Sequence, residues 1–206
     1  MNSTKLSTVA EQHLEKVRTH FDRRPKLTNA AKSYRRILAH YYNLIIPSFA
    51  SVLEVGCGSG ELLQSIRADK KVGIDVCAEQ VALAREQIPT GEFYVEAGET
   101  VDLPGKSFDY IVISETTNLA ADVQQMFQNL RSVALADTRL VINCYSSLWR
   151  PLIWLATRLG LRSKQPESSW LAPDDVVALL HLSDWNLFGQ RDELCVLLPC
   201  SVWKIF

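Results

Sequence analysis

Apolar residues form short unbroken runs in some parts of the chain and recur every three or four positions in others. The first pattern predicts buried strands, and the second predicts amphipathic helices. Two helical stretches come first, at residues 5–22 and 29–46. The two patterns then alternate, with strands expected at 51–55, 70–75, 92–97, 107–114 and 138–145 and helices at 60–68, 78–87 and 121–134. Such alternation favours an α/β fold with a mostly parallel sheet.

The last third of the chain departs from this alternation. Four further elements are expected there, namely helices at 148–161 and 171–182 and strands at 185–190 and 193–199. The polar pair Arg191-Asp192 lies between the two strands, which predicts a C-terminal antiparallel hairpin.

Composition restricts the class of protein. The 206 residues carry 22 Lys and Arg against 23 Asp and Glu, so charge gives no general reason to bind nucleic acid or an anionic membrane. The N-terminus lacks an apolar signal core, and no apolar run approaches the roughly 18 residues of a membrane span. The five cysteines form no C-x-x-C pair. We therefore expect one cytoplasmic domain, whose apolar end at 197–206 suits the front part of a longer chain.

A glycine loop follows the first expected strand. Gly56, Gly58 and Gly60 alternate in "LEVGCGSGELL", and Glu54 precedes them. The second strand ends in Asp75, fifteen residues after Gly60. In an open parallel sheet both features lie at the carboxyl edge, where a carboxylate can accept hydrogen bonds from a ribose. The ligand is therefore expected to carry a nucleoside.

Two nucleoside cofactors are alternatives for this loop. A nicotinamide dinucleotide favours G-x-G-x-x-G, with its pyrophosphate at a helix N-terminus. Here the spacing is one residue tighter, and the acidic Glu54 suits an ammonium group better than a pyrophosphate. No tyrosine is followed four residues later by lysine, as a short-chain reductase would require. These features favour S-adenosylmethionine.

The sequence resembles the class I S-adenosylmethionine-dependent methyltransferases in three motifs: "LEVGCGSGELL", "VGIDVCAEQVALARE" and "GETVDLPGKSFDYIVISE". The resemblance covers residues 50–145. It implies a Rossmann-like fold with a seven-stranded sheet, in which the hairpin supplies the antiparallel seventh strand. It also implies a set of cofactor-binding residues: Glu54, Gly56, Gly58, Gly60, Asp75, Val76, Gly98, Glu99, Thr100 and Ser114. Glu99 departs from the family, which has Asp at this position beside the adenine.

A narrower resemblance concerns the flanks of this core. "VRTHFDRRP", "YYNLIIP" and the segment after residue 143 resemble bacterial methyltransferase domains that are sometimes followed by a glycosyltransferase. This implies a glycan or lipid-linked acceptor, and a glycosyltransferase as fused domain or partner. The chain is then one methyltransferase domain, with an N-terminal helical arm at 1–48, a cofactor-binding core at 49–145 and an acceptor-side insertion with the hairpin at 146–206.

The catalytic residues are less defined, because methyl transfer mainly needs alignment and exclusion of water, with a general base where the acceptor loses a proton. The family fold places Ser114-Glu115-Thr116 opposite the methyl group, without the Pro-Pro-aromatic run of enzymes that methylate nucleic-acid bases. Candidate catalytic residues are Glu115, His20 and Tyr145, and further pocket candidates are Tyr41, Tyr42 and Trp149. The histidines equally suit a helix surface, and their spacing predicts no metal site.

Two alternatives stay open. Residues 148–161 suit an interfacial membrane helix, although a buried pocket wall, lid or dimer face is favoured. The domain could also bind S-adenosylmethionine as a sensor or partner module without turnover, since binding and catalysis share the same motifs.

Overall fold

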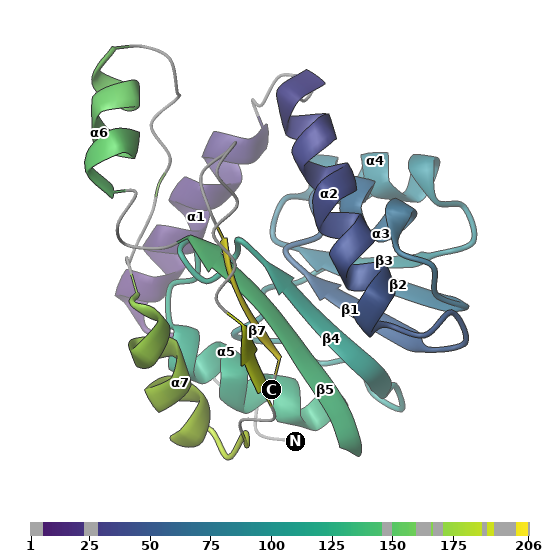
Figure 1. The fold of residues 1–206 in the computed structure, drawn as a ribbon. Coiled ribbons are helices and arrows are strands. Elements are labelled where there is room, and N and C mark those ends of the chain that lie inside the picture. Colours follow the sequence, from purple (N-terminus) through teal and green to yellow (C-terminus); the bar gives the residue numbers. More distant parts are fainter. Residues whose placement is uncertain are drawn as a thin grey trace.

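The computed structural model describes residues 6–22, 29–145, 150–159, 166, 171–186, 189–191 and 201–205. They form one sheet with helices on both faces (Figure 1). The strands are β1 Ser51–Val55, β2 Lys70–Asp75, β3 Glu92–Val95, β4 Phe108–Ser114, β5 Ala134–Tyr145, β6 Gly189–Arg191 and β7 Ser201–Ile205. The helices are α1 Thr8–Asp22, α2 Asn29–Ile45, α3 Glu61–Ser65, α4 Ala78–Gln87, α5 Val123–Leu130, α6 Arg150–Arg158 and α7 Pro173–His181, with a 3-10 turn η1 at Arg131–Val133.

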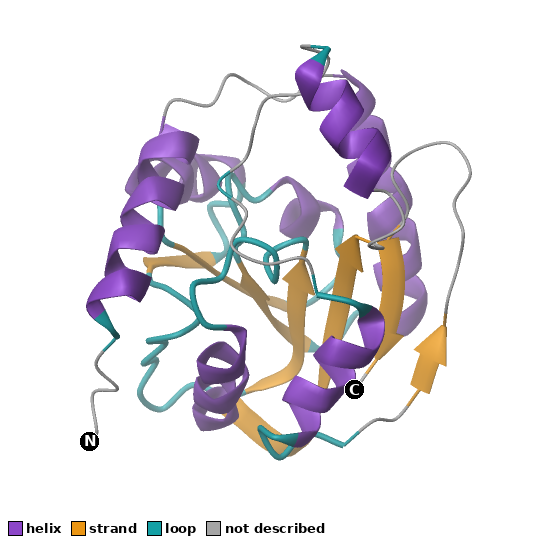
Figure 2. Cartoon of the chain, turned by 90° about the vertical axis from the view of Figure 1, so that its left-hand side faces the viewer, coloured by secondary structure: helices purple, strands orange, loops and turns teal. Residues whose placement is uncertain are grey.

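The strand order is β3-β2-β1-β4-β5-β7-β6, and the first five strands are parallel. This confirms the Rossmann-like parallel sheet that the sequence predicts. The chain runs outward from β1 through β2 to β3, then returns to β4 on the other side of β1. Ligands of open α/β sheets bind at such a switch point, beyond the carboxyl ends of the strands. Figure 2 shows loops gathered above the arrowheads at this edge.

The strands after β5 differ from the prediction at 185–190, and one strand lies where the sequence predicts none. β6 covers 189–191 and β7 covers 201–205, so Arg191 ends a strand instead of forming a turn. β7 pairs antiparallel with the end of β5, and β6 pairs antiparallel with β7. The apolar run at 193–199, read as a strand, lies outside the described residues. The strand at 201–205 was not predicted, because its pairing edge is provided by β5 and no local pattern encodes that contact.

Two helices are shorter than their apolar patterns predict. The expected helix at 60–68 ends at Ser65, because Ile66 is extended. The expected helix at 121–134 starts after Asp122, whose side chain accepts from the Gln125 amide, and gives way to η1 before β5 begins at Ala134. Element boundaries depend on such local caps, which apolar periodicity does not contain.

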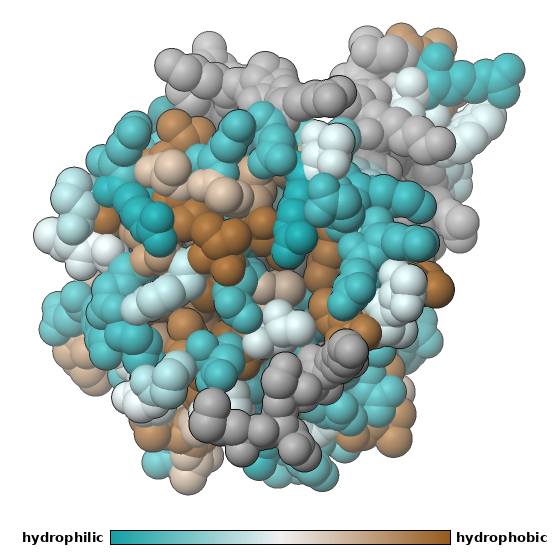
Figure 3. Space-filling view, turned by 180° about the vertical axis from the view of Figure 1, so that it is seen from behind, coloured by the Kyte–Doolittle hydropathy of each residue, from teal (hydrophilic) through white to brown (hydrophobic). Residues whose placement is uncertain are grey.

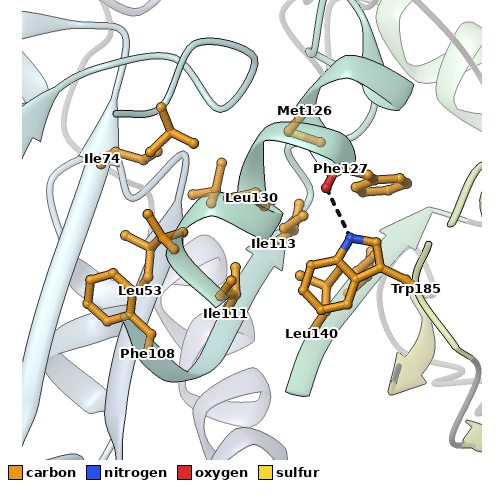
Figure 4. Packing of buried hydrophobic residues seen from close by; sticks show 14 of the residues in the cluster. Leu53, Ile74, Phe108, Ile111, Ile113, Met126, Phe127, Leu130, Leu140 and Trp185 are labelled. Carbon is orange, nitrogen blue, oxygen red and sulfur yellow. Dashed lines mark hydrogen bonds between the residues drawn. The ribbon is translucent and has the colours of Figure 1, made fainter. Parts of the chain in front are cut away.

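Each face of the sheet has its own apolar core. On one face, α2, α3 and α4 cover a cluster that includes Leu38, Leu62 and Val81. On the other face, α5 and α7 cover a cluster that includes Phe127 and Leu180. The second cluster also contains Trp185, whose indole N–H donates to the Phe127 carbonyl across 3.0 Å (Figure 4). Both clusters hold the strands rigid, so the loops at the carboxyl edge are positioned by a packed scaffold.

Exposed apolar side chains mark helix α6. Trp154 is 60% exposed, Leu155 45%, and Leu159, directly after the helix, 64%. These three residues are therefore not part of the core of the single chain, and the expected pocket wall, lid or dimer face stays a prediction. In Figure 1, α6 lies apart from the sheet layers. Apolar surface is also scattered between hydrophilic areas on the face in Figure 3. Among the described residues, no helix is both long and apolar enough to cross a membrane.

Candidate functional site

The glycine loop connects β1 to α3 at the carboxyl edge of the sheet. Gly56 has a φ of +75°, and a Cβ atom built there would lie 2.2 Å from the Thr116 hydroxyl oxygen. Gly58 also has positive φ, but among the described residues, its chain neighbours aside, a Cβ there would have only Gln80 Oε1 within 4 Å, at 3.9 Å. Glycine at 56 therefore lets β1 and β4 approach each other, whereas glycine at 58 leaves an open face of backbone for a ligand.

Asp75 ends β2 beside this loop. Its Oδ2 accepts the Gly58 amide at 2.8 Å, and its Oδ1 accepts the Cys77 amide at 2.9 Å. Burial raises the pKa of Asp75, and the two amide donors oppose this shift. The carboxylate thus holds the glycine loop against the start of α4. Each carboxylate oxygen can accept a further hydrogen bond, so Asp75 can also bind hydroxyl groups.

Glu54 is a carboxylate buried within β1, only 1% exposed. Its Oε2 has no hydrogen-bond partner among the described residues. Burial raises its pKa to about 8, and the nearby Arg35 guanidinium from α2 opposes the shift. Arg35 Nε also lies 3.9 Å from a carboxylate oxygen of Glu61, at the start of α3. An unpartnered buried acceptor beside an open glycine loop fits a ligand with an ammonium group.

Glu99 lies in the connection between β3 and β4, and its carboxylate points to the start of α5. Oε1 accepts the Ala121 amide at 2.7 Å and lies 3.4 Å from the Asp122 amide. Burial raises its pKa, and these amides oppose the shift. The neighbouring Thr100 amide donates to the Ala97 carbonyl at 3.1 Å. Glu99 and Thr100 therefore both have partners within the fold.

The end of β4 contains a strained acidic residue. Glu115 has a φ of +60°, a left-handed conformation that is uncommon outside glycine. Its amide donates to the Asn143 carbonyl at 3.1 Å, and its Oε1 is buried without a partner among the described residues. Strain of this kind costs on the order of 1–3 kcal/mol and concentrates at functional sites. Glu115 is the candidate catalytic residue whose geometry is best defined.

The other candidates divide by position. Tyr42 is fully buried, and its hydroxyl donates to Asn143 Oδ1 at 3.0 Å. His20 packs edge-on against Phe21, and Tyr41 against His40, with 5.0 and 5.9 Å between ring centroids. Tyr145 ends β5, but its side chain and the whole of Trp149 lie outside the described residues.

The structure brings several predicted residues together and gives contacts for Thr116 and Asn143 that the sequence does not show. Glu54, the glycine loop, Asp75, Ser114 and Glu115 all lie at the carboxyl ends of β1, β2 and β4. Gly98 fits closely there, because a Cβ would come within 3 Å of Met126 and Val55 atoms. The buried Nδ2 of Asn143 has no partner among the described residues. Thr116 belongs to the run after the fourth strand that the sequence already indicates, whereas Asn143 is not a site candidate from the sequence and only tertiary contact reveals it.

Residues 52–136 match the family model described as a methyltransferase domain. No curated protein matches the chain.

Solved structures share the fold at low sequence identity. A TehB-like S-adenosylmethionine-dependent methyltransferase from Corynebacterium glutamicum is 16% identical, with a TM-score of 0.64 over 91% of this chain and 97% of that one. A magnesium protoporphyrin IX methyltransferase from Synechocystis, solved with bound S-adenosylmethionine, is 12% identical, with a TM-score of 0.67 over 98% and 97%. The [4+2]-cyclase SpnF is 15% identical, with a TM-score of 0.61 over 76% of this chain and 60% of that one.

Proposed function

We propose that the chain is a class I S-adenosylmethionine-dependent methyltransferase that methylates a small-molecule, glycan or lipid-linked acceptor. The observation that carries the site is the open glycine loop, flanked by Asp75 and by the unpartnered oxygen of Glu54. S-adenosylmethionine matches it group for group, because it carries a ribose and an ammonium and has no phosphate.

Each cofactor group has a residue of suitable chemistry. Asp75 accepts the ribose hydroxyls while it keeps its bonds to the loop amides. Glu54 binds the ammonium, and Arg35, on the same side of the loop, binds the carboxylate. Val76 packs on the adenine, and Gly98, Glu99 and Thr100 line its edge. Ser114 borders the methyl group at the end of β4. Glu99 serves mainly to hold the adenine loop against α5, because its Oε1 is already used there.

The cofactor supplies an activated methyl group on a sulfonium. Transfer breaks the carbon–sulfur bond as the bond to the acceptor atom forms, so the protein has to align the acceptor and exclude water. Glu115 takes the proton that the acceptor loses, using the carboxylate oxygen that has no partner in the described structure. The left-handed backbone at this position aims the side chain.

A lipid-linked or otherwise amphiphilic acceptor is favoured by helix α6. Its exposed Trp154 and Leu155 lie beside Arg158, whose guanidinium carbon is 5.3 Å from the Trp154 ring centroid. The helix ends in Arg158 and has no acidic residue in its sequence. Such a surface can contact an apolar tail and an anionic linkage together. The helical arm at 1–48 and the segment 146–206 then form the acceptor side of a single domain, which could act with a glycosyltransferase.

S-adenosylmethionine binding without turnover is the second candidate. The cyclase SpnF is the reason to test this candidate. It shares the fold but is named for a cyclisation, so the fold alone does not establish methyl transfer.

The test is formation of S-adenosylhomocysteine from S-adenosylmethionine with separate pools of lipid-linked glycans, free glycans and small amines or phenols. We expect turnover with the lipid-linked pool, weakened by Trp154→Ala and unaffected by Leu182→Ala, a change at an exposed leucine after α7. Cofactor binding without turnover in every pool would support the second candidate.

A further inference from the structure

Helix α1 connects the two sides of the cofactor site. Near its middle, His13 Nε2 lies 2.9 Å from the carbonyl oxygen of Leu119, in the loop that follows β4. One anchor of this helix therefore lies on the loop that follows the carboxyl end of β4.

The C-terminal part of α1 is anchored on the opposite side, after β2. Arg18 Nε donates to the Val76 carbonyl at 3.2 Å. Asp22 Oδ1 accepts the Cys77 thiol at 2.7 Å, and the Phe21 carbonyl accepts from Gln80 Nε2 at 3.3 Å. These contacts are made with the two residues directly after Asp75 and with the first turn of α4.

The buried face of α1 is apolar but does not belong to either of the two core clusters. Ala10, Leu14 and Val17 are each at most 7% exposed and lie on one helical face, at spacings of four and three residues. None of them belongs to either core cluster. The helix is thus held by a short apolar stripe and by a few exposed or part-buried hydrogen bonds, and such elements open at lower free-energy cost than the core.

We propose that α1 is a strap that crosses the bound S-adenosylmethionine and must release its anchors for the cofactor to enter or leave. His13, Arg18 and Asp22 are its positioning residues. The inference rests on the proposed cofactor site, because the anchors at Leu119 and at Val76–Cys77 flank the strand ends where that site lies.

Charge explains why the cofactor would favour the closed strap. Asp22 and Asp75 carry like charges near each other, and Asp22 contributes to the raised pKa of Asp75. Ribose hydroxyls would donate hydrogen bonds to the Asp75 carboxylate. This lowers the electrostatic cost of holding the Asp22 carboxylate close to Asp75. Cofactor binding and docking of α1 should therefore favour each other.

Hydrogen exchange and binding kinetics test this directly. S-adenosylhomocysteine should slow amide exchange in α1 of the unmodified protein. Arg18→Ala and Asp22→Ala should each raise the association and dissociation rates of S-adenosylhomocysteine by about three- to thirtyfold. The matched control is Arg131→Ala, which removes a similar bond, from Arg131 Nη1 to the Asp184 carbonyl at 2.7 Å, beside the amino end of β5. That change should leave both rates unaltered.

A reversible cross-link gives an independent measurement. Asp22→Cys places a thiol next to Cys77, and oxidation should slow release of S-adenosylhomocysteine by roughly tenfold or more, with recovery on reduction. Asp22→Cys combined with Cys77→Ser should not respond to oxidant. Unchanged exchange in α1 on binding, or unchanged kinetics in the Arg18 and Asp22 variants or in the cross-linked protein, would overturn the strap while leaving the site intact. Failure of the unmodified protein to bind S-adenosylhomocysteine would instead remove the proposed function.

Discussion

The Thr116 hydroxyl donates a hydrogen bond to the main-chain carbonyl of Val55 across 3.0 Å. This contact joins the loop after β4 to the last residue of β1, directly before the glycine loop. It fills the space that a side chain at position 56 would need. The alignment of the glycine loop with the end of β4 therefore depends on a glycine and a threonine sixty residues apart.

Gly56→Ala should distort this junction. The new methyl would overlap the Thr116 hydroxyl, and φ at +75° disfavours any side chain. The control is Gly105→Ala, because Gly105 has a φ of +74° and nothing within 4 Å of its Cβ position. Gly105→Ala should cost only the backbone term, about 1–2 kcal/mol. Urea unfolding should show a clearly larger loss for Gly56→Ala, together with loss of S-adenosylhomocysteine binding, and equal losses would refute the steric argument.

Asp75→Ala should weaken S-adenosylhomocysteine binding by roughly ten- to a hundredfold, since hydrogen bonds to a charged group are worth about 1.5–3 kcal/mol each. Asp109→Ala is the matched control. Asp109 accepts the Ser51 amide at 2.8 Å and the Ser51 hydroxyl at 2.7 Å, at the opposite edge of the sheet. Titration calorimetry should find normal affinity in the control. Normal affinity in a folded Asp75→Ala protein would move the ribose elsewhere.

Glu54 should make the cofactor-free protein less stable as pH rises. Its pKa is about 8 in the folded protein against an ordinary 4.5, so folding binds a proton. The stabilisation is complete below about 4.5 and is lost as pH rises through 8. Urea unfolding at pH 5.5 and 8.5 should show this fall, reduced in Glu54→Gln. Glu92→Gln should not reduce it, because Lys106 lowers the pKa of Glu92. An identical pH slope in Glu54→Gln would exclude this titration.

The same carboxyl should release a proton when it meets the cofactor's ammonium. At pH 6.5 an α-amino group with a pKa of about 7.7–8.0 is already charged. Binding of S-adenosylhomocysteine should then release close to one proton from Glu54. Calorimetry in two buffers of different ionisation enthalpy measures the number of protons released. If no proton is released, Glu54 does not bind the ammonium group of the cofactor.

Replacing Glu115 with glycine should raise stability but slow catalysis. Glu115→Gly removes the strain of a left-handed φ of +60° and should stabilise the fold by about 1 kcal/mol, as Asp184→Gly should at its own φ of +60°. Only the Glu115 variant should slow methyl transfer, with S-adenosylhomocysteine affinity unchanged. Equal transfer rates in the two variants would leave Glu115 without a catalytic role.

Strong local patterns predicted the parallel part of the fold. Residues 70–75 and 78–87 have the expected bounds, because an apolar run and a helical period are both complete there. The glycine loop lies beside Asp75 as predicted, because the carboxyl ends of parallel strands lie at the same edge of the sheet. Other features depend on distant contacts that no local pattern encodes. The anchors of α1, the bond from Tyr42 to Asn143 and the pairing of β7 with β5 are all of this kind.

The identity of the cofactor is the central claim, and titration calorimetry tests it most directly. S-adenosylmethionine and S-adenosylhomocysteine should each bind the unmodified protein at one site, and Asp75→Ala should weaken both. NAD and NADP should give no binding heat, because the loop is tight and Glu54 places an acid where a pyrophosphate would be disfavoured. Binding of NAD without any response to S-adenosylhomocysteine would contradict the account.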